Sequence, residues 1–291
     1  MSLATFSFLM AHPLASRHRV RALGRWAGWQ AWSRTVGTPR AVAFANESRL
    51  WVAPGMTGAT GNLYAGLHEF EDMAFVLHAL RPSDLFVDVG ANVGSYTVLA
   101  GAAIGARCES FEPVPSTFAH LQRNVDLNGM QARVQLHQAG VGREPGTLRF
   151  SADEDTTNHV VAEGEGVSVP VVTLDDAIQE DGPLVLKMDV EGWETEALAG
   201  ARRLLDASSP RALVLELNGS GERYGFDDAD LHRDLLARGY APFAYHPFRR
   251  SLENLGDRIS DAGNTLYLND APFFRARVAS APPFRVFGER I

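Results

Sequence analysis

Cysteine is almost absent from this chain of 291 residues, and the single one, Cys108, excludes an internal disulfide. Because Cys108 lies in an apolar stretch expected to form a strand, we expect a buried and unreactive thiol. No apolar run approaches the roughly 20 residues that a membrane-spanning helix needs, and we expect no signal peptide because arginines interrupt the apolar segment near the start. These absences predict a cytoplasmic protein.

Acidic residues are missing from residues 1–40, which carry six arginines, whereas the rest of the chain holds 21 basic and 35 acidic side chains. The N-terminal segment therefore has a formal charge of +6 and the body a charge of −14. Nucleic acids are bound by basic surfaces that neutralise their phosphates. The acidic body therefore argues against DNA or RNA as a partner.

The basic N-terminal segment also carries Trp26, Trp29 and Trp32 at the three-residue spacing of one helix face. In the interpretation that we favour, this face packs on the body and the arginines point to solvent. The alternative is an interfacial helix that brings residues 12–34 into peripheral contact with the anionic inner face of a membrane. Both interpretations predict an N-terminal basic helix.

The most informative segment is an apolar run from Leu85 that ends at Asp88-Val89, breaks into a glycine loop, and restarts as a helix at Ser95. The loop reads Gly90-Ala91-Asn92-Val93-Gly94. Glycines at a strand-to-helix turn allow a ligand to approach the backbone closely. In an α/β sheet such a turn opens at the carboxyl ends of the strands, where ligands bind. The segment therefore predicts a site for a nucleoside-containing cofactor.

The identity of that cofactor follows from two acidic residues. The Gly-x-Gly-x-x-Gly fingerprint, which seats a pyrophosphate on a helix N-terminus, is missing. Asp88 would repel a pyrophosphate but suits a cofactor with a positively charged amino-acid end. The next strand, 107–111, ends at Glu112, which is placed to accept hydrogen bonds from both ribose hydroxyls. This combination resembles the S-adenosylmethionine (SAM) loop of class I methyltransferases and leaves a nicotinamide-dependent oxidoreductase as the weaker alternative.

Strands and helices alternate from residue 85 onward, which predicts a mostly parallel, doubly wound α/β sheet of the Rossmann-like class I methyltransferase fold. Strands are expected at 85–89, 107–111, 133–137, 184–188 and 211–217, and helices at 95–104, 115–127, 193–205 and 228–238. A last pair, 241–245 and 265–268, is expected to close the sheet with an antiparallel strand. An insertion at 140–173 is expected to hold a hairpin (147–151 and 167–172) and a polar stretch at 153–159.

The sequence predicts three parts along the chain. Residues 1–62 form an N-terminal extension with the basic helix and a hairpin (41–45 and 49–53), followed by a glycine-rich loop at 55–66. Residues 63–275 form the methyltransferase domain, which begins with an amphipathic helix at 69–80. Residues 276–291 form a C-terminal tail.

Lysine is the second scarce residue: of 27 basic side chains only Lys187 is not an arginine. It ends the fourth predicted strand, next to Asp189 and Glu191, which we expect to point toward the reactive methyl group of the cofactor. Lysine is compact and can lose its proton more readily than arginine. A carboxylate or a neutral lysine could therefore remove the proton of an acceptor hydroxyl. Asp189, Lys187 and Glu191 are the catalytic candidates, with His159 of the polar stretch as the other candidate base.

The fifth predicted strand brings Glu216 and Asn218 to the same edge of the sheet as Asp189. Together these three side chains offer the oxygen ligands that Mg²⁺ prefers. A metal ion there would bind an acceptor hydroxyl and lower its pKa. The alternative is that these side chains cap the following helix and bond to loop backbone.

Five blocks in this order resemble the FkbM-type methyltransferases, over roughly residues 64–220. The blocks are Glu69, the loop from Asp88 to Gly94, Glu112-Pro113, Thr173-Leu174-Asp175-Asp176, and the segment from Lys187 to Glu194. The resemblance implies a SAM-dependent O-methyltransferase that modifies sugars of surface or secreted glycoconjugates or polyketide-type natural products. It also implies that Lys187, Asp189 and Glu191 belong to the active-site block. The cofactor-binding candidates are Glu69, Asp88, Gly90, Ala91, Asn92, Gly94, Ser95, Glu112 and Pro113.

We expect the acceptor to be a hydroxyl on a sugar of a surface glycan or glycolipid. Two alternatives stay open: a polyketide-type natural product as acceptor, and a non-catalytic sugar-binding or scaffold protein that retains the cofactor. The charged segment from Lys187 to Glu194 argues against the last, because a binding module has no need of titratable groups beside the methyl group.

Overall fold

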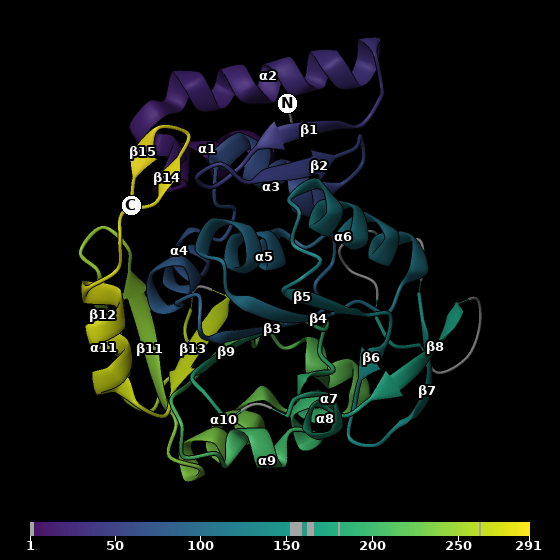
Figure 1. The fold of residues 1–291 in the computed structure, drawn as a ribbon, viewed down its shortest axis with the longest axis vertical. Helices are drawn as coiled ribbons and strands as arrows, with labels where there is room; N and C mark the ends of the chain where they lie inside the picture. Colours follow the sequence, from purple (N-terminus) through teal and green to yellow (C-terminus); the bar gives the residue numbers. More distant parts are fainter. Residues whose placement is uncertain (1–2, 152–158, 162–165, 180, 262) are drawn as a thin grey trace.

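A sheet of eight strands lies at the centre of the molecule (Figure 1), in a computed structural model that describes residues 3–151, 159–161, 166–179, 181–261 and 263–291. Its strands are β3 (Leu85–Val89), β4 (Arg107–Phe111), β5 (Val134–His137), β9 (Leu184–Met188), β10 (Arg211–Glu216), β11 (Ala241–His246), β12 (Ser251–Asn254) and β13 (Asn264–Leu268). Their order is β12-β11-β13-β10-β9-β3-β4-β5. The strands from β10 to β5 run parallel, and β13 lies antiparallel between β10 and β11. This topology confirms the predicted Rossmann-like α/β fold, with β12 as an additional edge strand.

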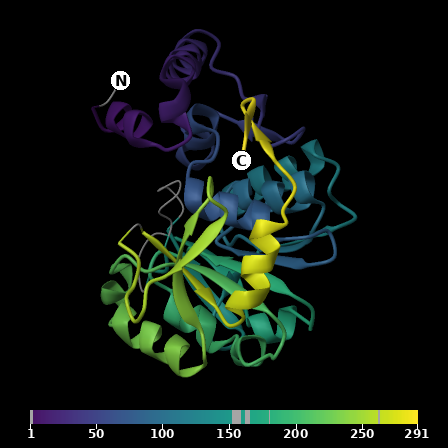
Figure 2. The same cartoon turned by 90° about the vertical axis from the view of Figure 1, so that its left-hand side faces the viewer.

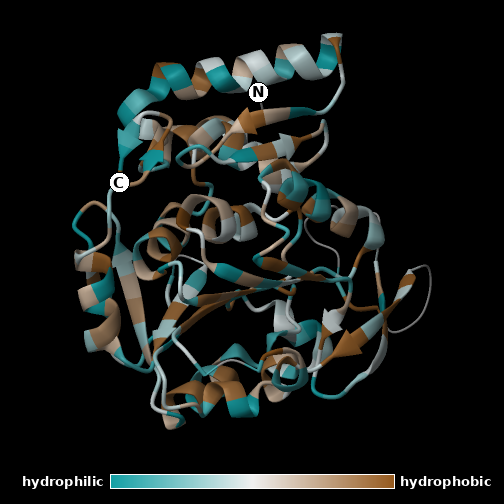
Figure 3. Ribbon diagram, in the orientation of Figure 1, coloured by the Kyte–Doolittle hydropathy of each residue, from teal (hydrophilic) through white to brown (hydrophobic). Residues whose placement is uncertain are grey.

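Helices cover both faces of the sheet (Figure 1). On one face lie α4 (Phe70–Ala79), α5 (Ser95–Val98) and α6 (Pro115–Leu127), and on the other α7 (Leu174–Ala177), α8 (Glu194–Ala199), α9 (Arg202–Leu205) and α10 (Asp228–Ala237). Because both faces are covered, every residue of the central strands β3 and β9 is buried. Figure 3 shows these strands largely in the brown of hydrophobic residues. Cys108 is buried in β4, as predicted.

Two predicted helices are interrupted in the structure. The helix expected at 95–104 consists of α5 followed by a π-helical segment, Leu99–Ile104. The helix expected at 193–205 is divided into α8 and α9 around Gly200, where a Cβ atom would lie 2.1 Å from the carbonyl oxygen of Gly142. A close approach of two backbone segments therefore fixes that break.

A small second sheet follows β5 in the chain. It joins β6 (Gly140–Val141), β7 (Gly146–Phe150) and β8 (Val167–Val172) in the order β6-β8-β7. The antiparallel pair β7–β8 is the hairpin predicted for the insertion. Of the polar stretch predicted at 153–159, all but His159 lies outside the described residues.

The N-terminal extension forms a layer above the helices of one face (Figure 1). It comprises α1 (Leu3–Ala11), the short η1 (Ala15–His18), α2 (Arg19–Thr35), β1 (Arg40–Ala43), β2 (Arg49–Val52) and α3 (Thr57–Ala65). The expected glycine-rich loop at 55–66 is thus wrong, because most of it is helix α3. Trp29 of α2 is buried, and Trp26 and Trp32 pack against the core, as in the favoured interpretation. Across the described part of the chain, no helix combines the length and apolarity needed to span a membrane.

The C-terminal residues fold back onto the extension instead of forming a tail (Figure 2). After α11 (Ala271–Ala279) the chain forms β14 (Arg285–Val286) and β15 (Glu289–Arg290). Val286 bridges to Ala45, and the backbone N–H of Asn46 donates to the Arg285 carbonyl at 2.7 Å. One hydrophobic core contains residues of the extension, the sheet and the C-terminus, from Leu9 to Ile291. The extension, the sheet and the C-terminal residues therefore share one hydrophobic core, and the expected boundaries near residues 62 and 276 stay predictions.

Candidate active site

A cavity of about 430 Å³ opens at the carboxyl ends of β3, β4, β9 and β10, and we call it the site cavity. Most of the residues predicted from the sequence line it: Glu69, Asp88, Gly90, Ala91, Asn92, Ser95, Glu112, Pro113, Lys187, Asp189, Glu191 and Glu216. The loops after four neighbouring parallel strands meet there, as in other α/β sheets. The alternation of strands and helices therefore brings the predicted cofactor-binding residues and the predicted catalytic residues to one place.

Three predicted residues do not line the site cavity. Gly94 precedes α5 with a φ of +86°, and a Cβ atom there would lie 2.5 Å from Leu121 Cδ1, so its role is in packing. The backbone N–H of His159 donates to Ser151 Oγ at 3.1 Å. Asn218 is exposed, and its Oδ1 accepts from the Ser220 N–H at 2.9 Å.

The glycine loop after β3 is shaped by the protein's own backbone. The N–H groups of Gly90 and Ala91 both donate to the Phe111 carbonyl, at 3.0 and 2.9 Å. Gly90 has a φ of +75°, and a Cβ atom on it would lie 1.9 Å from the carbonyl oxygen of Asp189. Only glycine can therefore stand between β3 and the residue that follows β9. Contact with the chain itself accounts for this glycine, and the close approach of a ligand stays a prediction.

Glu112, directly after β4, is held by two backbone hydrogen bonds. Its Oε2 accepts from the Asn92 N–H at 3.0 Å and its Oε1 from the Val114 N–H at 2.9 Å. Each carboxylate oxygen keeps a further lone pair for another donor. Burial raises the pKa of Glu112 to about 7. A pre-oriented carboxyl group with two remaining acceptor positions is suited to a pair of neighbouring hydroxyls.

Asp88 lies opposite Lys187 in the parallel pairing of β3 with β9. Its Oδ2 accepts a hydrogen bond from Thr97 Oγ1 at 2.6 Å, and Thr97 in turn contacts Ser110 Oγ at 2.8 Å. Burial raises the pKa of Asp88 to about 6. A hydrogen bond from Thr97 of α5 thus holds the Asp88 carboxyl group, and strand β9 places Lys187 opposite it.

Lys187 and Asp189 form an ion pair at the inner end of the site cavity. Lys187 Nζ donates to Asp189 Oδ2 at 3.1 Å, and the lysine side chain is 3% exposed while that of Asp189 is 34% exposed. Burial acts against the charged ammonium, but the charges of Asp189 and Glu69 outweigh it and raise the pKa of Lys187 above its usual range. The neutral lysine considered as a base from the sequence is therefore wrong. Burial alone would raise the pKa of Asp189, yet the Lys187 ammonium outweighs it and lowers that pKa.

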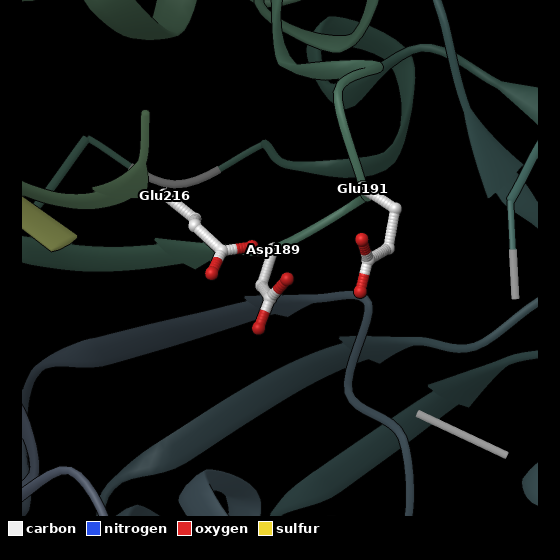
Figure 4. A group of neighbouring side chains, drawn as sticks. All are labelled: Asp189, Glu191 and Glu216. Carbon is white, nitrogen blue, oxygen red and sulfur yellow. The ribbon is translucent and has the colours of Figure 1, made fainter. Parts of the chain in front are cut away.

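Two further carboxyl groups flank Asp189 (Figure 4). Asp189, Glu191 and Glu216 each place a carboxyl oxygen within 4.8 Å of the others. Burial, together with the negative charge of Asp189, raises the pKa of Glu216 to about 8 and raises that of Glu191. Glu191, and not the predicted Asn218, is the third member of this group. Three such groups can hold a cation, but Lys187 already balances the charge of Asp189, and the Mg²⁺ ion stays a prediction.

The site cavity also contains residues that the sequence analysis did not assign to it. Tyr96 donates its hydroxyl to Glu69 Oε2 at 2.5 Å, and its ring centre lies 5.4 Å from Lys187 Nζ. Its place one residue into the helix after the glycine loop is a signal that could have identified it. Thr57 of α3 and Phe150 of β7 come from elements outside the alternating pattern, and no local signal marks them.

Comparison with known proteins agrees with this geometry. The model of the methyltransferase FkbM domain family matches residues 88–257, more than half of the chain. Methyltransferase 1 of Beauveria bassiana is 34% identical over 148 residues, covering 41% of this chain and 59% of that protein. The 31-O-demethyl-FK506 methyltransferase FkbM of Streptomyces tacrolimicus is 30% identical, covering 49% of this chain and 68% of that protein.

Two other comparisons are weaker. The hexuronic acid methyltransferase AglP of Haloferax volcanii is 26% identical, covering 48% of this chain and 59% of that protein. The crystal structure of methyltransferase FkbM from Methylobacillus flagellatus aligns with a TM-score of 0.44 at 21% identity, covering 72% of this chain and 52% of that one. The matches thus span about three fifths of the Beauveria and Haloferax proteins. On the match of the family model, the chain belongs to the methyltransferase FkbM domain family.

Proposed function

We propose that this chain is a SAM-dependent methyltransferase that transfers a methyl group to a hydroxyl oxygen. The observation that carries the proposal is the content of one cavity. Glu112 follows β4, Asp88 lies at the end of β3, and the Lys187–Asp189 pair lies at the end of β9, so three neighbouring strands supply three different functions.

The residues of the site cavity fit SAM. Glu112 has two acceptor positions left for the ribose hydroxyls, and the carboxyl groups of Asp88 and Glu69 suit the ammonium of the amino-acid end. The cavity volume of about 430 Å³ falls within the range of roughly 300–1,000 Å³ typical of small-molecule sites. When bound, the sulfonium supplies a methyl group to a nucleophilic oxygen.

In this proposal Asp189 removes the proton of the acceptor hydroxyl. Of the three neighbouring acidic side chains, Asp189 is the one whose pKa is lowered, so it is ionised at neutral pH. Its side chain is also partly exposed to the cavity. Lys187 keeps Asp189 charged and in place through their hydrogen bond. Glu216, whose pKa is raised to about 8, is protonated at neutral pH and adds no second charge beside the base. Alignment of the hydroxyl with this base is the main task of the protein.

For the acceptor, we propose a hydroxyl on a sugar of a surface glycan or glycolipid. The name of the Haloferax relative, a hexuronic acid methyltransferase, supports a sugar. The name of the Streptomyces relative supports the second candidate, a polyketide-type natural product. The charge of −14 on residues 41–291 speaks against a nucleic acid.

Calorimetry with S-adenosylhomocysteine (SAH) tests the cofactor proposal. We expect binding by the wild type and its loss in Glu112→Ala, because the two acceptor positions for the ribose are removed. Asp126→Ala, which removes an exposed carboxyl group on α6, is the control and should bind normally. Tight binding of NAD with no binding of SAH would contradict the proposal and favour the oxidoreductase. Binding of SAH with no methyl transfer to glycan or polyketide extracts would favour the non-catalytic alternative.

A further inference from the structure

A second cavity of about 450 Å³ adjoins the site cavity, and we call it the side cavity. The two cavities share His68, Glu69 and Glu216 in their walls. Glu112, which follows β4 at the other end of these strands, lines the site cavity but not the side cavity. The side cavity therefore meets the site cavity beside Glu216, whose carboxyl oxygen lies within 4.8 Å of one of Asp189, and not at the position suited to the ribose.

The N-terminal extension builds one wall of the side cavity with Phe8, Ala11 and His12. His12 fixes this wall to the domain: its Nε2 donates to the Leu67 carbonyl at 2.6 Å, while its Nδ1 accepts from the N–H groups of Leu14 and Ala15. The Phe8 ring packs edge-on against His68, with ring centres 5.0 Å apart. A wall supplied by α1 is therefore held at a fixed distance from Glu69.

The opposite wall comes from the start of α4 and from β13. Asn264 Nδ2 donates to Asp72 Oδ2 at 2.9 Å and joins these two elements. Glu71, the neighbour of Asp72, is exposed in the side cavity. Glu69, Glu71, Asp72 and Glu216 give this space four carboxyl groups in all.

No arginine or lysine lies among the described residues that line the side cavity. Its two histidines do not supply a positive charge at neutral pH, because burial lowers the pKa of both His12 and His68. Because Glu216 is protonated at neutral pH and Asp72 is partly protonated, the like charges that a negatively charged acceptor meets come from Glu69 and Glu71, and the cavity wall offers it no ion-pair partner. Hydroxyl groups, in contrast, donate well to carboxylate oxygens.

We propose that the side cavity is the acceptor site and that it takes an uncharged, hydroxyl-rich molecule such as a neutral sugar in preference to an acidic one. The inference rests on the proposed function. An acceptor in the side cavity would contact Glu216, close to Asp189 and away from Glu112, and so would meet the methyl group where the two cavities join. The partly exposed ring of Phe8 offers an apolar surface to the C–H face of a sugar ring. The preference differs from the substrate in the name of the Haloferax relative, a hexuronic acid.

Matched pairs of methyl glycosides test the charge preference. Transfer from labelled SAM is measured for methyl glucoside, galactoside and mannoside, each against the corresponding methyl hexuronide. We expect at least one neutral glycoside to be methylated, with kcat/KM about tenfold or more above that of its acidic partner, because the like charges destabilise the acidic complex. A preference for the hexuronides, or no transfer to any neutral member by protein that binds SAH, would overturn the inference. Failure of the wild type to bind SAH would instead overturn the proposed function.

Two substitutions of alanine by tryptophan test where the acceptor binds. Ala11 and Ala237 are both exposed and both end a helix, but only Ala11 lines the side cavity. Ala11→Trp fills that space, so we expect kcat/KM for the neutral glycoside to fall about tenfold or more with the affinity for SAH unchanged. Ala237→Trp should leave both unchanged. Equal activity of the two variants would place the acceptor elsewhere.

A charge reversal tests the cause of the preference. Glu71→Arg introduces a cation into the side cavity, whereas Glu47→Arg makes the same change at an exposed turn that lines neither cavity. We expect Glu71→Arg to reduce the ratio of neutral to acidic glycoside in kcat/KM by about tenfold, and Glu47→Arg to leave it as in the wild type. An unchanged ratio in Glu71→Arg would contradict an electrostatic origin.

Discussion

At the scale of single residues, the ion pair of Lys187 and Asp189 defines the chemistry of this site. A buried ammonium 3.1 Å from a carboxylate keeps that carboxylate charged, while its neighbours Glu191 and Glu216 have raised pKa values. Three carboxyl groups of similar position therefore have different roles. In the proposed mechanism the environment, and not the residue type, makes Asp189 the base.

Replacing that base should slow the reaction and leave cofactor binding intact. In Asp189→Asn the side chain keeps its shape but cannot accept the proton, so we expect kcat to fall by about 10²–10⁴-fold, the usual range for the loss of a general base. Methyl transfer from labelled SAM and calorimetry with SAH measure the two quantities separately. Asp126→Asn, at an exposed position of α6, is the control. Near-normal turnover of Asp189→Asn would remove Asp189 from the mechanism.

At the scale of helices and strands, local patterns predicted most of the sheet and the helices α4, α6 and α10 packed on it, but not helix α3. The run from Leu85 to Val89 is apolar apart from Asp88, and this pattern alone indicates a strand. The structure shows that strand wholly buried. Gly58 and Gly61 favour a loop in the sequence, whereas the structure has helix α3 there. The packing of α3 explains the glycine at position 61, because a Cβ atom on Gly61 would lie 2.7 Å from the His68 ring.

Local sequence patterns also predicted only part of the site cavity. The cofactor loop and the block from Lys187 to Glu191 follow strands of the alternating pattern, so their meeting could be predicted. Phe150 and Thr57 reach the site cavity from β7 and α3 through contacts between distant parts of the chain. Contacts of this kind leave no periodic signal in the sequence.

The connection between β3 and α5 gives a prediction at this scale. Gly90→Ala combines a left-handed backbone with a Cβ atom 1.9 Å from the Asp189 carbonyl oxygen, whereas Gly129→Ala has the left-handed backbone, with a φ of +62°, and no atom within 4 Å. Left-handed backbone costs a non-glycine residue about 1–2 kcal/mol. We expect Gly129→Ala to lose about that much free energy of unfolding and Gly90→Ala to lose more. Urea unfolding measures both, and equal losses would contradict the close contact.

At the scale of the whole molecule, the two ends of the chain complete one body. His18 Nε2 lies 2.5 Å from Glu289 Oε1, and Val286 bridges to Ala45, so the C-terminal hairpin holds to the extension, and Val286 shares a hydrophobic core with residues of the sheet. The sequence indicated an extension and a tail because contacts between residues more than 200 positions apart have no local signal.

The outer face of α2 bears on the predicted membrane contact of residues 12–34. Trp29 is buried, so the exposed arginines of this helix, Arg19, Arg21 and Arg34, are the groups available to an anionic surface. Basic residues near such a surface contribute about 1 kcal/mol each. A peripheral contact of this kind stays a prediction, and its form would be electrostatic without inserted tryptophans.

The whole molecule should lose stability as pH rises from 6.5 to 8.5. Burial raises the pKa of Asp72, Glu112 and Glu194 to about 7 and, with the charge of Asp189, that of Glu216 to about 8. Each group binds a proton in the folded state that the unfolded chain has already released, so folding becomes less favourable as these protons are lost. The pKa values of His12, His68 and His78 are lowered, so these histidines change the free energy of unfolding below about pH 6.5 and not between pH 6.5 and 8.5.

Urea unfolding at the two pH values measures this effect. We expect a lower free energy of unfolding at pH 8.5 than at pH 6.5, and a smaller difference in Asp72→Asn, which removes one of the titrating groups but keeps an oxygen to accept from Asn264. Glu47→Gln removes an exposed carboxyl group instead and should show the wild-type difference. A free energy that stays constant or rises with pH would contradict the raised pKa values. Because Glu216 is one of these groups, such a result would also remove the basis for a protonated Glu216 beside the charged Asp189.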